Sequence, residues 1–473
     1  MLTWPLVKDG RVKTVIQLLM AVFLAAVSAP PAAAQGLNEF DEAREAINRG
    51  DIDGAIGLYD RMLDGARLGP DGQATAYSYR SFAYLLKAQS SAGDTAKKNY
   101  EQAIADAGDA IRRAPDDVRA HFVRGAAFSY TGRFDDAIKD LDIMIGLDPR
   151  MPEAYVARGF AHNGKGDYDN AIGDFSAAIE RRPFYAIPFK LRGVAYGYRG
   201  QYDKAVDDFD KAIKLNPDDV ESYYDRGIAY FNGGKSDKAI ADLDIVAGAE
   251  PENAAVFAAR GRVRSASGEY DTAIADFDTA LGLNPKDAES HYYRAVAYSA
   301  RGDYANAIAD LNDTIKAKPG LFDAYFARGR NQFYAGNFGQ AANDIERSLA
   351  IRPNDPYRSL WLHFARTKEK KDDAAELARN IGKPDAAAWP GPLAAYFLGQ
   401  ATAEQVMAAA AQPGDARTRK LQTCQASFYL GEDSLLRGDA DAAKKRLAEA
   451  RDSCPRFFVE YEAAAAELKR VGK

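Results

Sequence analysis

Prolines that recur every 34 residues limit how this chain can fold more than any other feature. The series is Pro115, Pro149, Pro183, Pro217, Pro251, Pro285, Pro319 and Pro353. A fixed period of this length indicates one structural unit copied many times. Such a unit cannot bury its apolar face alone, so we expect the copies to stack into a solenoid. Because a solenoid presents long walls rather than a closed catalytic pocket, the period favours binding over catalysis.

The residue pattern of each unit predicts two helices, A and B. The unit ends at the proline, which cannot continue helix B. The seven full units begin at Val118, Pro152, Ala186, Val220, Ala254, Ala288 and Phe322. Helix A is predicted to end at a glycine, where the left-handed conformation is favoured. These glycines are Gly132, Gly166, Gly200, Gly234, Gly268, Gly302 and Gly336. An aspartate is predicted to cap helix B, and the candidates are Asp135, Asp169, Asp203, Asp237 and Asp271.

The spacing of these residues resembles the pattern of the tetratricopeptide repeat (TPR) family over most of the chain. In the unit that begins at Pro152, Arg158, Gly159, Tyr168 and Ala171 occupy recurring positions. The resemblance implies an all-α fold, a right-handed superhelical solenoid of antiparallel helix pairs. It also implies that helix A lines a concave groove that binds segments of other proteins.

One position departs from the family pattern. All seven units carry an arginine where the family usually has an apolar residue, at Arg124, Arg158, Arg192, Arg226, Arg260, Arg294 and Arg328. An aspartate follows sixteen residues later, at Asp140, Asp174, Asp208, Asp242, Asp276, Asp310 and Asp344. The arginines could form a ladder for an acidic ligand, or each could join helix A to helix B through its aspartate. Equal numbers at a constant offset favour the pair, and a guanidinium suits such a site better than an ammonium group.

The N-terminus carries the pattern of a secretory signal peptide. Lys8, Arg11 and Lys13 precede an apolar stretch over 15–29, and small residues follow at 32–34; this is the typical layout. An uncleaved anchor is the alternative, but the stretch is shorter than the roughly 20 residues of a spanning helix. We therefore predict that residues 1–34 are removed, leaving no stable membrane insertion and a net charge of about −8 (−6 less the +2 of residues 1–34).

The period weakens on both sides of the regular units. Residues 35–117 predict divergent helices of the same kind, with about ten extra residues around 89–98. Regular units cover 118–355, and residues 356–423 predict an irregular helical segment. Residues 424–473 predict one more helix pair and a capping helix. In that pair Cys424 opens helix A and Cys454 closes helix B, so we predict a structural disulfide between neighbouring helix ends.

The C-terminal region also resembles NlpI-type TPR proteins. The motifs that carry this likeness are Leu360-Trp361-Leu362-His363, Trp389-Pro390-Gly391, Phe428-Tyr429-Leu430-Gly431 and Phe458-Val459-Glu460. The resemblance implies a periplasmic adaptor of Gram-negative bacteria, with peptidoglycan hydrolases or a periplasmic protease as partners, and a possible homodimer. The family's members are lipoproteins, whereas this chain has no cysteine near the predicted cleavage point, and its array is longer. A scaffold in exopolysaccharide export or outer-membrane assembly is the alternative.

The sequence carries no pattern for catalysis, a cofactor or a metal. The histidines, His121, His162, His291 and His363, are dispersed without metal-ligand spacing. No phosphate-binding glycine loop or nucleophile elbow is present. No run rich in lysine and arginine supports nucleic-acid binding. We therefore expect a non-enzyme that binds proteins or peptides.

The candidate binding residues lie on helix A of several units. An aromatic groove with a few cations suits an extended or helical peptide. The pattern leaves open whether each aromatic side chain faces the groove or packs between repeats. The candidates are Phe122, Tyr130, Phe160, Lys190, Tyr198, Tyr224, Phe231, Arg262, Tyr292, Phe326, Arg330, Phe333 and Tyr334.

Overall fold

The computed structural model describes residues 37–65, 68–383, 385, 387–412, 414–455 and 458–472, and these residues form helices without strands. The predicted all-α TPR-type fold is therefore confirmed. The predicted signal peptide, residues 1–34, lies outside the described part. The chain divides into two compact units, Met1–Val246 (unit 1) and Ala247–Lys473 (unit 2). Their boundary falls inside α13 (Ser236–Ala249), where the proline period gives no sign of a break.

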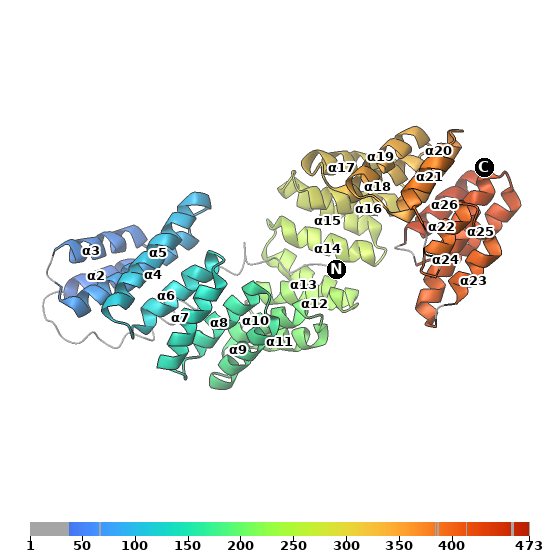
Figure 1. Ribbon diagram of the computed structural model, residues 1–473. Helices are drawn as coiled ribbons and strands as arrows, with labels where there is room; N and C mark the ends of the chain where they lie inside the picture. Colours follow the sequence, from blue (N-terminus) through green and yellow to red (C-terminus); the bar gives the residue numbers. More distant parts are fainter. Residues whose placement is uncertain are drawn as a thin grey trace. The chain divides into compact units, whose positions relative to one another are not determined.

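Unit 1 is a series of antiparallel helix pairs, coloured blue to green in Figure 1. Its first two pairs are α2 (Leu37–Asn48) with α3 (Ile52–Asp64) and α4 (Pro70–Gln89) with α5 (Gly93–Arg113). Regular pairs follow: α6 (Val118–Tyr130) with α7 (Phe134–Leu147), α8 (Pro152–Lys165) with α9 (Tyr168–Arg181), α10 (Ala186–Tyr198) with α11 (Tyr202–Leu215), and α12 (Val220–Asn232) with α13. The extra residues of the N-terminal region lengthen α4 and α5 to 20 and 21 residues, against 13 and 14 in the first regular pair.

Unit 2 continues the repeat and then departs from it. Its regular pairs are α14 (Ala254–Ala266) with α15 (Tyr270–Leu283), α16 (Ala288–Arg301) with α17 (Tyr304–Ala317), and α18 (Phe322–Tyr334) with α19 (Phe338–Ile351). The irregular part holds α20 (Pro356–Lys368), α21 (Ala374–Ile381), α22 (Gly391–Phe397) and α23 (Ala403–Ala411). The final helices are α24 (Ala416–Leu436), α25 (Ala440–Ser453) and α26 (Val459–Val471). Helix α26 packs on α18, α24 and α25.

Glycines allow both the turn and the close approach of helices within a unit. The seven predicted terminal glycines all have positive φ, between +70° and +85°, a conformation that side chains with a Cβ rarely adopt. Gly193, in the middle of α10, has a different role. A Cβ there would lie 2.9 Å from Cε1 of Phe209 on α11, so only glycine permits this helix spacing.

The predicted caps of helix B are wrong by two residues. The N-caps are Arg133, Asp167, Gln201, Glu269, Asp303 and Asn337. The predicted aspartates lie in the first turn instead, where the helix dipole favours a negative charge. Four of them bind the basic residue at or just past the end of helix A in the next unit, forming the pairs Asp135–Lys165, Asp169–Arg199, Asp203–Lys235 and Asp271–Arg301.

The seven predicted Arg–Asp pairs are present and join helix A to helix B. In the pair of Arg192 with Asp208, Nε and Nη2 donate to the two carboxylate oxygens at 2.7 and 2.9 Å. The same contact recurs in the other six units. An eighth pair, Arg80 with Asp106, spans the enlarged pair α4–α5 at 2.7 and 2.9 Å. Each of these arginines is an internal strut between helix A and helix B. The arginines therefore do not form a ladder for an acidic ligand.

Candidate functional site

The candidate residues of unit 1 lie along its A helices and link successive units. Tyr130 stacks on Tyr100 with ring centroids 5.4 Å apart, and its ring lies 6.2 Å from that of Phe160. Tyr198 stacks on Tyr168 at 5.0 Å. The side chains of Tyr130, Tyr198, Tyr224 and Phe231 are half-buried, whereas Phe122 and Phe160 are buried. Tyr130 and Tyr198 therefore join successive repeats, and all four half-buried rings keep part of their surface exposed on the A helices.

A small hollow lies between α6, α8 and α10. Phe122, Tyr130, Phe160 and Leu191 line it, and its volume is about 20 Å³. This volume corresponds to about one water molecule. The hollow is a packing seam, and a partner would contact the surface of the A helices rather than enter it.

The candidate cations Lys190 and Arg262 already bind carboxylates of the same chain. Nζ of Lys190 lies 3.1 Å from Asp219 and 2.8 Å from Glu221. Burial opposes the charge of Lys190, but the two carboxylates outweigh this effect and raise its pKa. In unit 2, Arg262 donates to Glu289 at 2.9 Å and lies over the ring of Tyr293.

In unit 2 the C-terminal helix α26 covers the A helices. Phe333 is 1% exposed and Tyr334 is 6% exposed. Arg470 of α26 donates to the backbone oxygens of both residues, at 3.0 and 3.1 Å. Glu462 of α26 lies 3.9 Å from Arg330 and accepts from Ser299 of α16 at 3.4 Å. The candidates Arg330, Phe333 and Tyr334 therefore contact the chain's own last helix.

A buried ionic cluster fixes α26 to α20 and α24. Lys368 lies 3.3 Å from Glu432 and 3.2 Å from Glu467, and Arg470 pairs with Glu467 as well. Glu432 is fully buried. Burial and the nearby charge of Glu467 raise the pKa of Glu432 to about 7.

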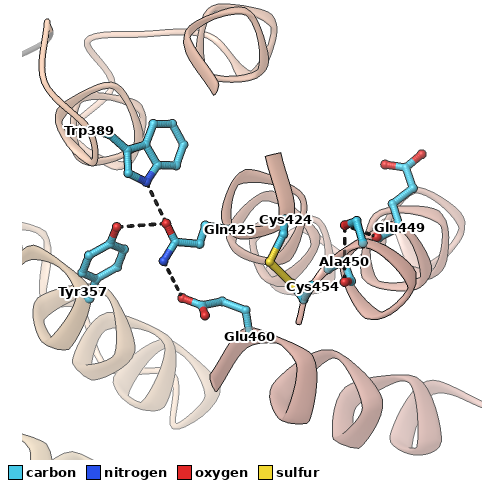
Figure 2. The surroundings of a disulfide bond; sticks show 9 residues. Tyr357, Trp389, Cys424, Gln425, Glu449, Ala450, Cys454 and Glu460 are labelled. Atoms are coloured by element: carbon cyan, nitrogen blue, oxygen red, sulfur yellow. Dashed lines mark hydrogen bonds between the residues drawn. A yellow bond between two sulfur atoms is a disulfide. The ribbon is translucent and has the colours of Figure 1, made fainter. Parts of the chain in front are cut away.

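The predicted disulfide between Cys424 and Cys454 is confirmed, with their Cα atoms 5.1 Å apart. Helix α24 begins at Ala416, so Cys424 lies inside the helix and does not open it as predicted. Figure 2 shows the next residue, Gln425, as a hub between four segments. Its Oε1 accepts from Tyr357 at 3.1 Å and from Trp389 at 2.8 Å, and its Nε2 donates to Glu460 at 3.2 Å.

A larger cavity, of about 360 Å³, lies beside this hub. It is bounded by α18, α20, α24 and the start of α26. Its wall includes the candidate Phe326, while Tyr292 is half-buried on α16. This is a volume in which a ligand group fits.

Three stretches of the chain match family models of this repeat. Residues 124–186 and 258–321 match the model described as tetratricopeptide repeat, and residues 193–234 match the model described as TPR repeat. The stretches 124–186 and 258–321 each contain helix pairs closed by Arg–Asp struts. This chain is a TPR protein.

Solved structures of other TPR proteins resemble parts of it. MamA is 25% identical over 34% of this chain and 93% of its own, with a TM-score of 0.32. A TPR protein from Parabacteroides merdae is 20% identical over 52% of this chain and 98% of its own, with a TM-score of 0.42. YrrB, described as a TPR protein with an unusual peptide-binding site, is 22% identical over 39% of this chain and 95% of its own, with a TM-score of 0.34.

TPR proteins bind peptide or protein partners and are generally non-catalytic, so the repeats make this protein a scaffold for protein–protein interaction. Within the described residues, no helix of this TPR protein is long and apolar enough to cross a membrane.

Ligand atoms of His291, Asp310 and Asp313 lie within 4.8 Å of one another. The two ring nitrogens of His291 already contact Asp310 and the backbone oxygen of Pro285, at 2.9 and 3.2 Å. His121 makes the same two contacts with Asp140 and Pro115, which indicates a structural role for both histidines.

Sequence reasoning missed the cluster of Lys368, Glu432, Glu467 and Arg470 and the hub at Gln425. These residues lie on separate helices outside the regular period, so no spacing relates them. The signal that existed was charge at positions that the repeat template makes buried: Glu432 follows Leu430-Gly431 on the predicted helix A of the last pair.

Proposed function

We propose that this TPR protein is a non-catalytic adaptor of the bacterial cell envelope that holds partner proteins on the A helices of unit 1. The row of half-buried rings at Tyr130, Tyr198, Tyr224 and Phe231 carries the proposal. Within the described part of unit 1, closely packed helices are either consecutive or A helices of neighbouring units. Its A-helix surface is therefore accessible to an amphipathic or extended segment of another protein.

The proposed location is the periplasm of a Gram-negative bacterium. Its support is the signal-peptide pattern of residues 1–34, together with the disulfide, which suits an oxidising compartment. The C-terminal motifs that resemble NlpI-type proteins favour peptidoglycan hydrolases or a periplasmic protease as partners, and a homodimer. Fractionation of cells that express the full chain tests the location, and recovery of a full-length, uncleaved protein from the cytoplasm would contradict it.

Affinity capture from envelope extract tests the binding surface. We expect the double variant Tyr198→Ala with Phe231→Ala to reduce the amount of captured partner at least tenfold, because both substitutions remove rings of the A helices. The matched control is Ile143→Ala with Leu147→Ala. It removes two exposed apolar side chains (45% and 44% exposed) from α7, which is a B helix. Loss of partners from the control variant, with retention by the first variant, would place the interface on the B helices instead.

A further inference from the structure

The cavity of unit 2 has an aromatic wall and polar groups at one end. Its volume is about 360 Å³, within the range of ligand pockets. The rings of Phe326, Tyr357, Trp361, Tyr429 and Phe458 line it. Aromatic faces carry negative potential and attract cations.

The charged residues of the cavity are one arginine and two carboxylates, Arg358, Asp355 and Glu460, which sum to −1. Glu460 is 5% exposed. It accepts from the neutral amide of Gln425, and no basic side chain among the described residues lies within ion-pair distance of it. Burial raises the pKa of Glu460. Among the described residues, the buried carboxylate of Glu460 therefore has no ion-pair partner, and the charge of Arg330 acts on it only at longer range. A buried charge of this kind is costly until it is paired.

The described arginines near the cavity, Arg358 and Arg330, already have carboxylate partners. Arg358 donates to Asp323 at 2.8 Å and lies 3.3 Å from Asp355. Arg330 on α18 is paired with Glu462 of α26. An anionic ligand would therefore find no unpaired arginine there among the described residues. A cationic ligand would meet Glu460 and five aromatic rings.

Arg358 nevertheless offers hydrogen bonds to a neutral group. This residue is 7% exposed, and its Nε and Nη1 have no hydrogen-bond partner within the described residues. The contact of Nη1 with Asp355 is an ion pair without hydrogen-bond geometry. A carbonyl oxygen is the neutral acceptor that a polypeptide supplies.

We propose that this cavity binds the ammonium group of a lysine side chain from a partner protein, with Glu460 as countercharge and Arg358 as donor to a backbone carbonyl of the same segment. This proposal deepens the proposed role as a scaffold and rests on it. A free small amine has the same ammonium chemistry but lacks the carbonyl, so the two sources are distinguishable.

Tryptophan fluorescence of the full chain measures binding directly. Trp361 lines the cavity and Trp389 donates to Gln425, so two of the three tryptophans of the chain report on it. The probes are N-acetyl-lysine methylamide, its norleucine counterpart, butylamine and acetate. We expect the lysine probe to change the fluorescence and to bind about tenfold more tightly than the norleucine probe. Tighter binding of the lysine probe than of butylamine assigns the site to a polypeptide, and equal binding assigns it to a free amine.

Two variants test the role of the carboxylates. Glu460→Gln keeps an acceptor for Gln425 and should weaken the lysine probe about tenfold, whereas Glu449→Gln, on the exposed face of α25, should leave it unchanged. Asp355→Asn keeps a good N-cap for α20 and should weaken the probe in the same direction. Equal binding of the norleucine and lysine probes, binding of acetate alone, or no response to any probe would overturn the proposal. Those results would leave capture of partners by unit 1 unaffected.

Discussion

Units 1 and 2 share one repeat and differ in what lies on their A helices. In unit 1 the close helix contacts among the described residues join consecutive helices or the A helices of neighbouring repeats. In unit 2, α26 lies on α18 and α24, and α20 contacts α22 and α24. The same repeat position therefore has two environments: Phe231 on α12 is half-buried, and Phe333 on α18 is 1% exposed.

This difference shows which contacts the repeats make when a further helix packs on them. Helix α26 binds unit 2 through charges and backbone acceptors as well as through apolar side chains, among them Val459, Tyr461 and Leu468. Its contacts with unit 2 include Glu462 with Arg330, Arg470 with the end of α18, and Glu467 with Lys368. A partner that binds unit 1 meets aromatic rings instead, because Lys190 is already paired there. The predictions below test this contrast.

Truncation of the two equivalent phenylalanines should give the largest difference. Phe333→Ala removes a buried ring beneath α26, so we expect the free energy of unfolding to fall by about 4 kcal/mol. Phe231→Ala removes a half-buried ring and should cost about 1 kcal/mol, with loss of partner binding. Urea unfolding followed by circular dichroism measures both. Equal costs would show that the two A-helix surfaces have the same burial in solution.

Removal of the disulfide should weaken unit 2 alone. The bond closes a separation of 30 residues, for which chain entropy gives about 3.6 kcal/mol. We expect Cys424→Ala with Cys454→Ala to lower the protection of α24 and α25 amides in hydrogen exchange by that amount, with α6–α11 unchanged. Wild-type protein treated with a reductant is the control and should behave alike. Faster exchange in unit 1 would contradict the assignment of the bond to unit 2.

The docking of α26 should depend on pH through Glu432. Burial raises the pKa of Glu432 to about 7, above the value of about 4.3 in an unfolded chain. Because the folded state favours the protonated carboxyl, this stabilisation is complete below about pH 4.3 and is lost as the pH rises through 7. Glu432→Gln should remove the decline and slow exchange of α26 amides at pH 8, by about 3.5 kcal/mol. Glu449→Gln, which is exposed, should change nothing; a pH slope that persists in Glu432→Gln would assign it to another group.

The period predicted what repeats and missed what occurs once. Each strut was predictable because Arg192 and Asp208 recur in register with six other pairs. The cap at Asp167 was missed because Asp169, two residues later, recurs more regularly, for its pairing with Arg199. The cover of Phe333 by α26 had no signal, since the template gives Phe231 and Phe333 the same environment. The disulfide was predictable because the template returns around Cys424 and Cys454, whereas the cavity depends on four helices brought together by tertiary packing.

The smallest expected effect is in unit 1, at His121. Burial opposes the charge of this imidazole, but its bonds to Asp140 and to the backbone oxygen of Pro115 outweigh that and raise its pKa. The charged form therefore stabilises the fold below about pH 6.5, and this contribution is lost as the pH rises through the folded-state value. Tyr155 holds the equivalent position one unit later and donates to the backbone oxygen of Pro149 at 3.2 Å. We therefore expect His121→Tyr to keep that bond, to remove the pH dependence and to change the free energy of unfolding at pH 8 by less than about 1 kcal/mol. Thermal unfolding between pH 5 and pH 8 measures the slope, and a slope equal to that of the wild type would exclude His121 as its source.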